Sequence, residues 1–291
     1  MEKSAKALKI AMAQLNPTVG AVAANAALLR SIRVASGDAD VIVAGELFLT
    51  GYPPEDLVLK RAFLAHVAEE AEKLVADTAE GGPALVFGLP VVENGVLYNS
   101  VMVADGGHSA VRHKVHLPNY AVFDEKRLFG AGAMPEPVKL RGLRVGVPIC
   151  EDIWFADVCA YLKMQGAELL ISPNGSPFER GKHAKRLHHA TARAKETGLP
   201  LVYVNQIGGQ DELVFDGASF AVNSDGEVAA QRPAWETEMH MLTLNETKKG
   251  WQSMPQDRAI IDGDLGDIYA AAVTGLRDYV EKNRFPGVLL G

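Results

Sequence analysis

Short apolar runs alternate with amphipathic segments along most of the chain. The runs ALKIAMAQL (7–15) and DVIVAGEL (40–47) are β-rich, and NAALLRSIRVASG (25–37) between them has apolar residues at helical spacing. A longer amphipathic pattern covers LVLKRAFLAHVAEEAEKLVADTAE (57–80) and ends at a Gly-Gly-Pro sequence. The pattern therefore predicts two strands, each followed by a helix.

The middle of the chain predicts hairpins and further strands. Asn94-Gly95 and Asp225-Gly226 are strong turn signals between apolar runs, so each predicts a β-hairpin. We expect helices after Cys150 and after Pro177. The predicted strands of this region lie within 83–93, 96–107, 108–117, 143–150, 167–173, 200–206 and 217–231.

Strands outnumber helices and alternate with them, which indicates an α/β fold with parallel crossovers and some antiparallel hairpins. More than about ten strands would make one open sheet unusually wide. We therefore predict two sheets packed face to face, with helices on the outside.

The C-terminal part of the chain has a different character. From about residue 245, NETKKGWQSMPQDRAIIDGDL is polar and irregular, and DIYAAAVTGLRDYVEKN (267–283) then has helical periodicity. The final GVLLG is typical of a buried strand that begins another domain. We predict a main domain over 1–245, a linker over 246–265, and a helix and strand over 266–291 that lead into a further domain.

Composition excludes several classes of protein. The net charge of −7 argues against a nucleic-acid-binding surface, and no apolar run approaches the length needed to cross a bilayer. The first residues show no signal-peptide pattern. Cys150 and Cys159 are too few and too close for a disulfide framework, so we expect a cytoplasmic setting. No CxxC or HExxH pattern indicates a metal site.

Three predicted strands end in residues with complementary chemistry: Glu46, Lys114 and Cys150. Each taken alone is ordinary, since a cysteine after an apolar run is most often a small core residue. Because ligands bind beyond the carboxyl ends of parallel strands, the three side chains are predicted to converge on one pocket.

Such a trio suits acyl transfer from an amide. A carboxylate can take the proton of a thiol that is mostly neutral at pH 7, and an ammonium can stabilise the oxyanion. A Cys–His pair is the weaker alternative, because His113 and His116 flank Lys114 and alternate with it in strand direction.

Five motifs in order carry a family resemblance: GELFLTGYPPEDL, KVHLPNYAVFDEKRLF, CEDIW, SPNGSPF and VYVNQIGGQDELVFDGASF. Together they resemble the nitrilase superfamily of carbon–nitrogen hydrolases, which have a four-layer α-β-β-α sandwich and a Glu-Lys-Cys triad. The closer similarity is to the glutaminase domains of glutamine-dependent NAD synthetases.

The resemblance implies a role for each matching residue. Cys150 would attack the side-chain amide of L-glutamine, Glu46 would be the general base, and Lys114 would stabilise the oxyanion. The implied products are glutamate and ammonia, formed through a thioester. Four further positions match residues that bind glutamine in the family: Tyr120, Glu151, Ser176 and Lys182.

The resemblance also implies partners. The glutaminase domain needs no cofactor, whereas the following synthetase domain of the family binds ATP, Mg²⁺ and deamido-NAD and uses the ammonia to make NAD. Homo-oligomers are expected. Two alternatives remain open: an amidase, carbamoylase or nitrilase that acts on another small substrate, and a scaffold that is active only together with the second domain.

Overall fold

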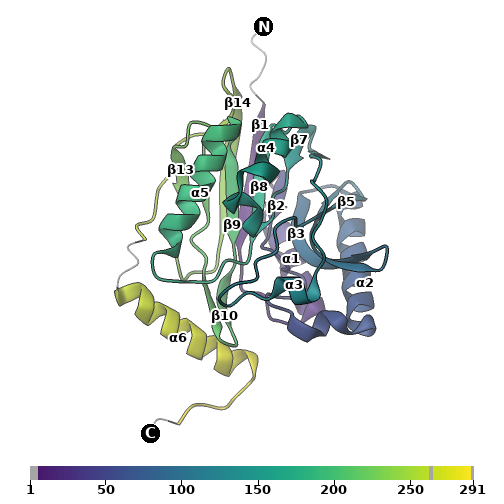
Figure 1. Cartoon of the computed structure of the whole chain (residues 1–291), viewed down its shortest axis with the longest axis vertical. Helices are drawn as coiled ribbons and strands as arrows, with labels where there is room; N and C mark the ends of the chain where they lie inside the picture. Colours follow the sequence, from purple (N-terminus) through teal and green to yellow (C-terminus); the bar gives the residue numbers. More distant parts are fainter. Residues whose placement is uncertain (1–5, 262–264, 290–291) are drawn as a thin grey trace.

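Two β-sheets lie face to face between two pairs of helices (Figure 1). The computed structural model describes residues 6–261 and 265–289. The first sheet has seven strands, in the spatial order β15 (Gly250–Ser253), β14 (Glu238–Thr247), β1 (Ala7–Gln14), β2 (Val41–Val43), β3 (Ala84–Glu93), β4 (Val96–Asp105) and β5 (His108–His113). The second has six, in the order β13 (Val228–Gln231), β12 (Phe220–Val222), β9 (Leu201–Asn205), β8 (Leu169–Asn174), β7 (Leu143–Gly146) and β6 (Val138–Leu140). A separate hairpin is formed by β10 (Ile207–Gln210) and β11 (Leu213–Asp216).

The helices form the outer layers. Their bounds are α1 (Val22–Ala35), α2 (Arg61–Asp77), α3 (Glu125–Leu128), α4 (Ala156–Met164), α5 (Lys182–Thr197) and α6 (Leu265–Lys282). The described residues also include three short 3₁₀ turns: η1 (Glu55–Leu59), η2 (Thr78–Glu80) and η3 (Cys150–Trp154). Helix α6 packs on the β10–β11 hairpin, at the lower left in Figure 1.

Alternation along the strands explains the layers. Ile10 and Met12 of β1 and Val202 of β9 lie in the core between the two sheets. Ala11 points the other way, into the core under α1 and α2, and Tyr203 points into the core under α4 and α5. Each sheet therefore buries both faces, as strands with continuous apolar runs require. The predicted α-β-β-α sandwich is confirmed.

Strand direction brings several predicted site residues to one edge. β2 is parallel to β3, and β4 is antiparallel to both β3 and β5, so β5 runs in the same direction as β2. In the second sheet β7, β8 and β9 are parallel. The segments after β2, β5, β7 and β8 carry Glu46, Lys114, Cys150 and Ser176 respectively.

Two predicted strands end earlier than expected. The strand before Cys150 stops at Gly146, because Pro148 has no N–H with which to continue a ladder. The strand before Lys114 stops at His113, and residues 114–117 form no strand. Cys150 instead begins η3.

The predicted linker is wrong over its first part. β14 continues to Thr247, and β15 pairs with it and buries Trp251 between the sheets. Leu242 and Leu244 are two residues apart and face the same core. This spacing is typical of a strand, and the sequence prediction missed it. β6, β10 and β11 were also not predicted as strands.

The predicted C-terminal helix corresponds to α6 and is confirmed. The predicted final strand is wrong for residues 286–289, which are exposed and form no strand, since no neighbouring strand lies alongside to pair with them. Residues 290 and 291 lie outside the described part of the chain.

Gly88 in β3 allows the backbone at Glu46 to approach closely. A Cβ atom at Gly88 would lie 2.0 Å from the backbone nitrogen of Leu47 and 2.7 Å from the Cα of Glu46. We predict that Gly88→Ala lowers the free energy of unfolding by about 1–3 kcal/mol in urea titrations, because backbone must move to make room.

Gly37→Ala is the matched control, since its Cβ would meet no atom nearer than 3.8 Å. That variant should unfold within about 0.5 kcal/mol of the parent. If Gly88→Ala were as stable as Gly37→Ala, the close approach would be refuted.

Candidate active site

Cys150 lies at the start of η3 with a backbone φ of 44°, in the left-handed region. A residue other than glycine rarely adopts this conformation, and it is typical of functional sites. The side chain is a free thiol and is almost fully buried. Burial raises the pKa of this thiol, and Glu46 raises it further, while Lys114 opposes both. At neutral pH the sulfur is therefore protonated and needs a base before it can act as a nucleophile.

Glu46 and Lys114 form a fully buried ion pair. The Nζ atom of Lys114 lies 2.6 Å from Oε1 of Glu46. Asn99 of β4 donates to the same oxygen at 2.7 Å, and the backbone N–H of Gly175 donates to Oε2 at 2.9 Å. Donors from three other segments thus fix the Glu46 carboxylate. The predicted convergence of these two strand ends is seen directly in this contact.

Glu125 is a further member of the cluster, which sequence reasoning missed. Lys114 Nζ lies 2.9 Å from each of its carboxylate oxygens, and the Tyr52 hydroxyl donates to it at 2.9 Å. Burial raises the pKa of Glu125 to about 7, with Glu46 adding to the shift and Lys114 opposing it. Glu125 sits on the four-residue helix α3, which is too short to show a periodic pattern.

The pKa of Lys114 shows which effect dominates in this cluster. Burial acts to lower it, but the carboxylates of Glu125 and Glu46 outweigh burial and hold the pKa well above its usual value. Lys114 therefore remains an ammonium at neutral pH, and its fixed positive charge acts on the Cys150 thiol.

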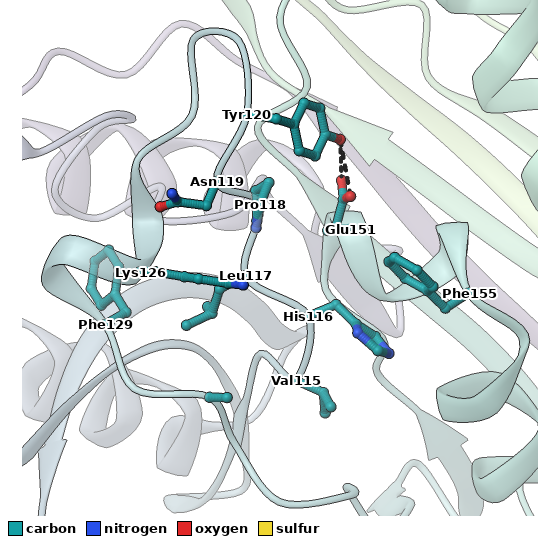
Figure 2. Close-up of a pocket in the computed structure, with 11 residues that line it drawn as sticks. Val115, His116, Leu117, Pro118, Asn119, Tyr120, Lys126, Phe129, Glu151 and Phe155 are labelled. Carbon is teal, nitrogen blue, oxygen red and sulfur yellow. Dashed lines mark hydrogen bonds between the residues drawn. The ribbon is translucent and has the colours of Figure 1, made fainter.

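Tyr120 and Glu151 form a hydrogen-bonded pair. The Tyr120 hydroxyl lies 2.9 and 3.0 Å from the two carboxylate oxygens of Glu151, as Figure 2 shows. Both residues line a cavity of about 570 Å³, together with His116, Lys126 and Phe155. Burial raises the pKa of Glu151.

Lys182 lies in a second cavity, of about 460 Å³, which Tyr120 also lines. Its Nζ atom is 3.2 Å from a carboxylate oxygen of Glu179. The same atom lies 5.7 Å from the ring centre of Phe123 and 5.2 Å from that of Trp154. Tyr120 therefore borders both cavities, with Glu151 on one side and Lys182 on the other. Cys150 lines neither cavity.

Ser176 is buried and contacts Arg186 of α5. Its Oγ atom accepts a hydrogen bond from Nε of Arg186 at 2.9 Å, so the hydroxyl hydrogen remains available for another acceptor. Arg186 is fully buried and pairs with Asp216 at 2.8 Å. The sequence pattern did not single out Arg186, because it lies on a very polar helix whose charged residues are expected to face solvent.

The two histidines of the Cys–His alternative make other contacts. His113 lies 2.7 Å from the Ser100 hydroxyl and 2.7 Å from a carboxylate oxygen of Glu93. His116 pairs with Asp157 at 2.9 Å. These contacts hold the rings in place and favour Glu46 as the base.

Comparisons with known proteins define the class of protein to which this chain belongs. A family model described as Carbon-nitrogen hydrolase matches residues 9–252, which is most of the chain. The chain therefore belongs to the carbon–nitrogen hydrolase family. The resemblance expected from the five motifs is confirmed.

Several relatives share one description. The chain is 45% identical over 286 residues to a glutamine-dependent NAD(+) synthetase of Rhodobacter capsulatus, covering 97% of this chain and 52% of the relative. A second, from Xylella fastidiosa (strain Temecula1 / ATCC 700964), is 40% identical over 98% of this chain and 53% of its own length. The chain thus spans about half the length of the curated relatives it matches.

Solved structures show the same fold. A glutamine-dependent NAD+ synthetase from Acinetobacter baumannii, in complex with ADP, is similar with a TM-score of 0.88 and 36% identity, covering 97% of this chain and 54% of that one. A mutant of the Nesterenkonia AN1 amidase, from the nitrilase superfamily, has a TM-score of 0.70 and 26% identity, covering 82% of this chain and 90% of that one.

Within 6–261 and 265–289, no helix has both the length and the apolarity to cross a bilayer. Over the same ranges, no group of three His, Cys, Asp or Glu residues is placed to hold a metal ion.

We predict that Lys114→Met destabilises the fold by about 3–5 kcal/mol in urea unfolding, because it leaves two buried carboxylates without their cation. Adding Glu125→Gln to Lys114→Met should restore part of that loss, since one of those charges is then removed. Lys163→Met, at an exposed position of α4, is the control. A stability loss no larger than that of the control would contradict the buried cluster.

Proposed function

We propose that this chain is a glutamine amidohydrolase, which converts L-glutamine and water to glutamate and ammonia through a thioester on Cys150. The single observation that carries the proposal is the buried Glu46–Lys114 contact of 2.6 Å, whose two charges act on a Cys150 thiol that is neutral at rest. The family of the chain and the relatives' shared description support it.

The first half of the reaction forms the thioester. Glu46 takes the proton from the Cys150 sulfur as the sulfur attacks the amide carbon of glutamine. Lys114 and a backbone N–H after Cys150 stabilise the negative charge on the amide oxygen. Glu46 then gives its proton to the departing nitrogen, so that ammonia leaves and the C–N bond breaks.

The second half regenerates the enzyme. Glu46 removes a proton from a water molecule, which attacks the thioester carbon. The C–S bond breaks, the sulfur takes back a proton from Glu46, and glutamate leaves. The three donors on the Glu46 carboxylate keep it in place through both proton transfers.

The glutamine head group is assigned to the four residues predicted from the resemblance. Glu151 binds the α-ammonium beside Tyr120, and Lys182 binds the α-carboxylate. Lys182 is buried and charge-paired with Glu179, so a substrate carboxylate would compete with Glu179 for it. The Ser176 hydroxyl can donate a hydrogen bond as well as accept one, which suits a carboxylate acceptor.

In the longer relatives, we propose that the ammonia is used by the second half of the polypeptide for ATP-dependent amidation of deamido-NAD to NAD. ATP, Mg²⁺ and deamido-NAD would bind to that second half. Exposed apolar residues on α6, among them Tyr269, Val273 and Leu276, support a contact with such a partner domain. We also propose a homo-oligomer in the cytoplasm, where two buried free thiols would persist.

We predict that Cys150→Ala abolishes glutaminase activity, measured as glutamate released, while the circular dichroism spectrum is unchanged. No other group can form the thioester. Cys159→Ala is the control, because Cys159 lies on α4 and is buried in the core between that helix and the second sheet. Parent-like turnover by Cys150→Ala would refute the mechanism.

A second prediction separates glutamine from other small amides. Lys182→Met should raise the KM for glutamine about 10- to 100-fold, the effect of one lost hydrogen bond to a charged group. Hydrolysis of propionamide, which has no carboxylate, should be unaffected. Lys195→Met is the control, since Lys195 lies on the same helix α5 at an exposed position.

The competing activity makes the opposite prediction. An amidase, carbamoylase or nitrilase would have a higher kcat/KM for propionamide, N-carbamoyl amino acids or simple nitriles than for glutamine. In that case Lys182→Met would leave the KM for glutamine unchanged.

A further inference from the structure

Three backbone N–H groups converge on the buried carboxylate of Asp152. Its Oδ1 atom accepts from the N–H of Val115 at 3.1 Å and from that of His116 at 2.8 Å. Its Oδ2 atom accepts from the N–H of Ile149 at 2.9 Å. The side chain is fully buried, and the mechanism above gives it no role.

These three donors lie directly beside two residues of the proposed triad. Val115 and His116 follow Lys114 along the chain, and Ile149 precedes Cys150. The first segment leaves the first sheet at the end of β5, while the second lies between β7 of the second sheet and η3. A single carboxylate therefore bridges the edges of two sheets at the site where the ammonium and the thiol must meet.

Both segments need such an anchor. Each has left its strand, so these N–H groups have no ladder partner, and a buried N–H without an acceptor is costly. Cys150 also has a left-handed φ of 44°. A strained residue keeps its conformation only when its surroundings hold it.

Only an ionised carboxylate fits all three donors. Both of its oxygens are acceptors, whereas an amide of the same shape has one acceptor and one donor group. Burial raises the pKa of Asp152 to about 6, and the N–H donors of His116 and Ile149 oppose the shift. At neutral pH the carboxylate is therefore mostly ionised and able to accept all three bonds.

We propose that Asp152 is a positioning residue, which fixes the Lys114 ammonium relative to the Cys150 sulfur by holding the backbone beside each of them. The proposal rests on the proposed function for its catalytic consequence, but the geometry it describes can be tested without glutamine.

The first test is Asp152→Asn, which keeps the size of the side chain. The amide must present its NH₂ group to one set of N–H donors, so one of the two segments is released. We expect kcat for glutamine to fall about 10- to 100-fold, because displacements of about 1 Å at a catalytic group have effects of this size. The KM should change by less than about threefold.

The second readout is the pH dependence of Cys150 alkylation by iodoacetamide in the Cys159→Ala background. The charged groups that act on the thiol include Glu46, Lys114, Glu151, Glu125 and Arg186, and the hydroxyls of Tyr52, Tyr120 and Tyr203 also face it. Removing a negative charge would by itself lower the thiol pKa, whereas displacing Lys114 would raise it. We therefore expect the alkylation profile of Asp152→Asn to move to higher pH.

Asp157→Asn is the matched control. Asp157 also contacts His116, but through the imidazole ring at 2.9 Å rather than through the backbone. Its substitution should leave kcat and the alkylation profile unchanged.

If Asp152 only stabilised the fold, we would expect a different result. Asp152→Asn would then be less stable in urea, with kcat and the alkylation profile as in the parent, and this result would overturn the proposal. If Asp152→Asn does not fold, Asp152→Glu takes its place. Its carboxylate extends one methylene further and cannot keep all three bonds, so we expect a lower kcat and a profile at higher pH. Parent values for both quantities would again overturn the proposal.

A failure of the proposed function would look different. If the parent chain does not hydrolyse glutamine but the alkylation profile of the variant still moves to higher pH, the function is wrong and the positioning role stands.

Discussion

The buried cluster of Glu46, Lys114 and Glu125 is the constraint on which the rest of the site depends. The Lys114 ammonium lies 2.6 Å from the Glu46 carboxylate and 2.9 Å from that of Glu125, and all three side chains are buried from water. Removing such charges from water costs more than their attraction normally returns, so a buried ion pair is a poor way to stabilise a fold. Its presence is better explained by the proposed chemistry, in which Glu46 is the base and Lys114 a fixed cation, and both act on the Cys150 thiol.

The sandwich is what makes this cluster possible. Glu46 and Lys114 come from one sheet, and Cys150 and Gly175 come from the other, so the site exists only where the two edges meet. The bonds that cross between the sheets at this edge are few and specific. Gly175 bonds Glu46, and Asp152 bonds the segments beside Lys114 and Cys150. Packing of the shared core sets the distance between the sheets, and these bonds set the distances between reacting atoms.

Much of this arrangement could be predicted from the sequence, for a physical reason. Apolar alternation and turn residues such as Asn94-Gly95 are local signals, and they located most strands and the ends at which Glu46 and Lys114 lie. The parts of the site that could not be predicted depend on contacts between residues far apart in the sequence. Glu125 and Arg186 have the local surroundings of exposed residues, and only the tertiary fold buries them. Pro148 was visible in the sequence, but the apolar residues around it predicted a strand up to Cys150, whereas β7 ends at Gly146.

The most direct test of the central claim is to react the chain with a chloroketone analogue of glutamine and map the adduct by peptide mass spectrometry. The account predicts a single adduct on Cys150, none on Cys159, and slower formation in Glu46→Gln, because the neutral thiol then lacks its base. An adduct on Cys159, or a rate that Glu46→Gln leaves unchanged, would contradict the claim that the buried cluster activates Cys150.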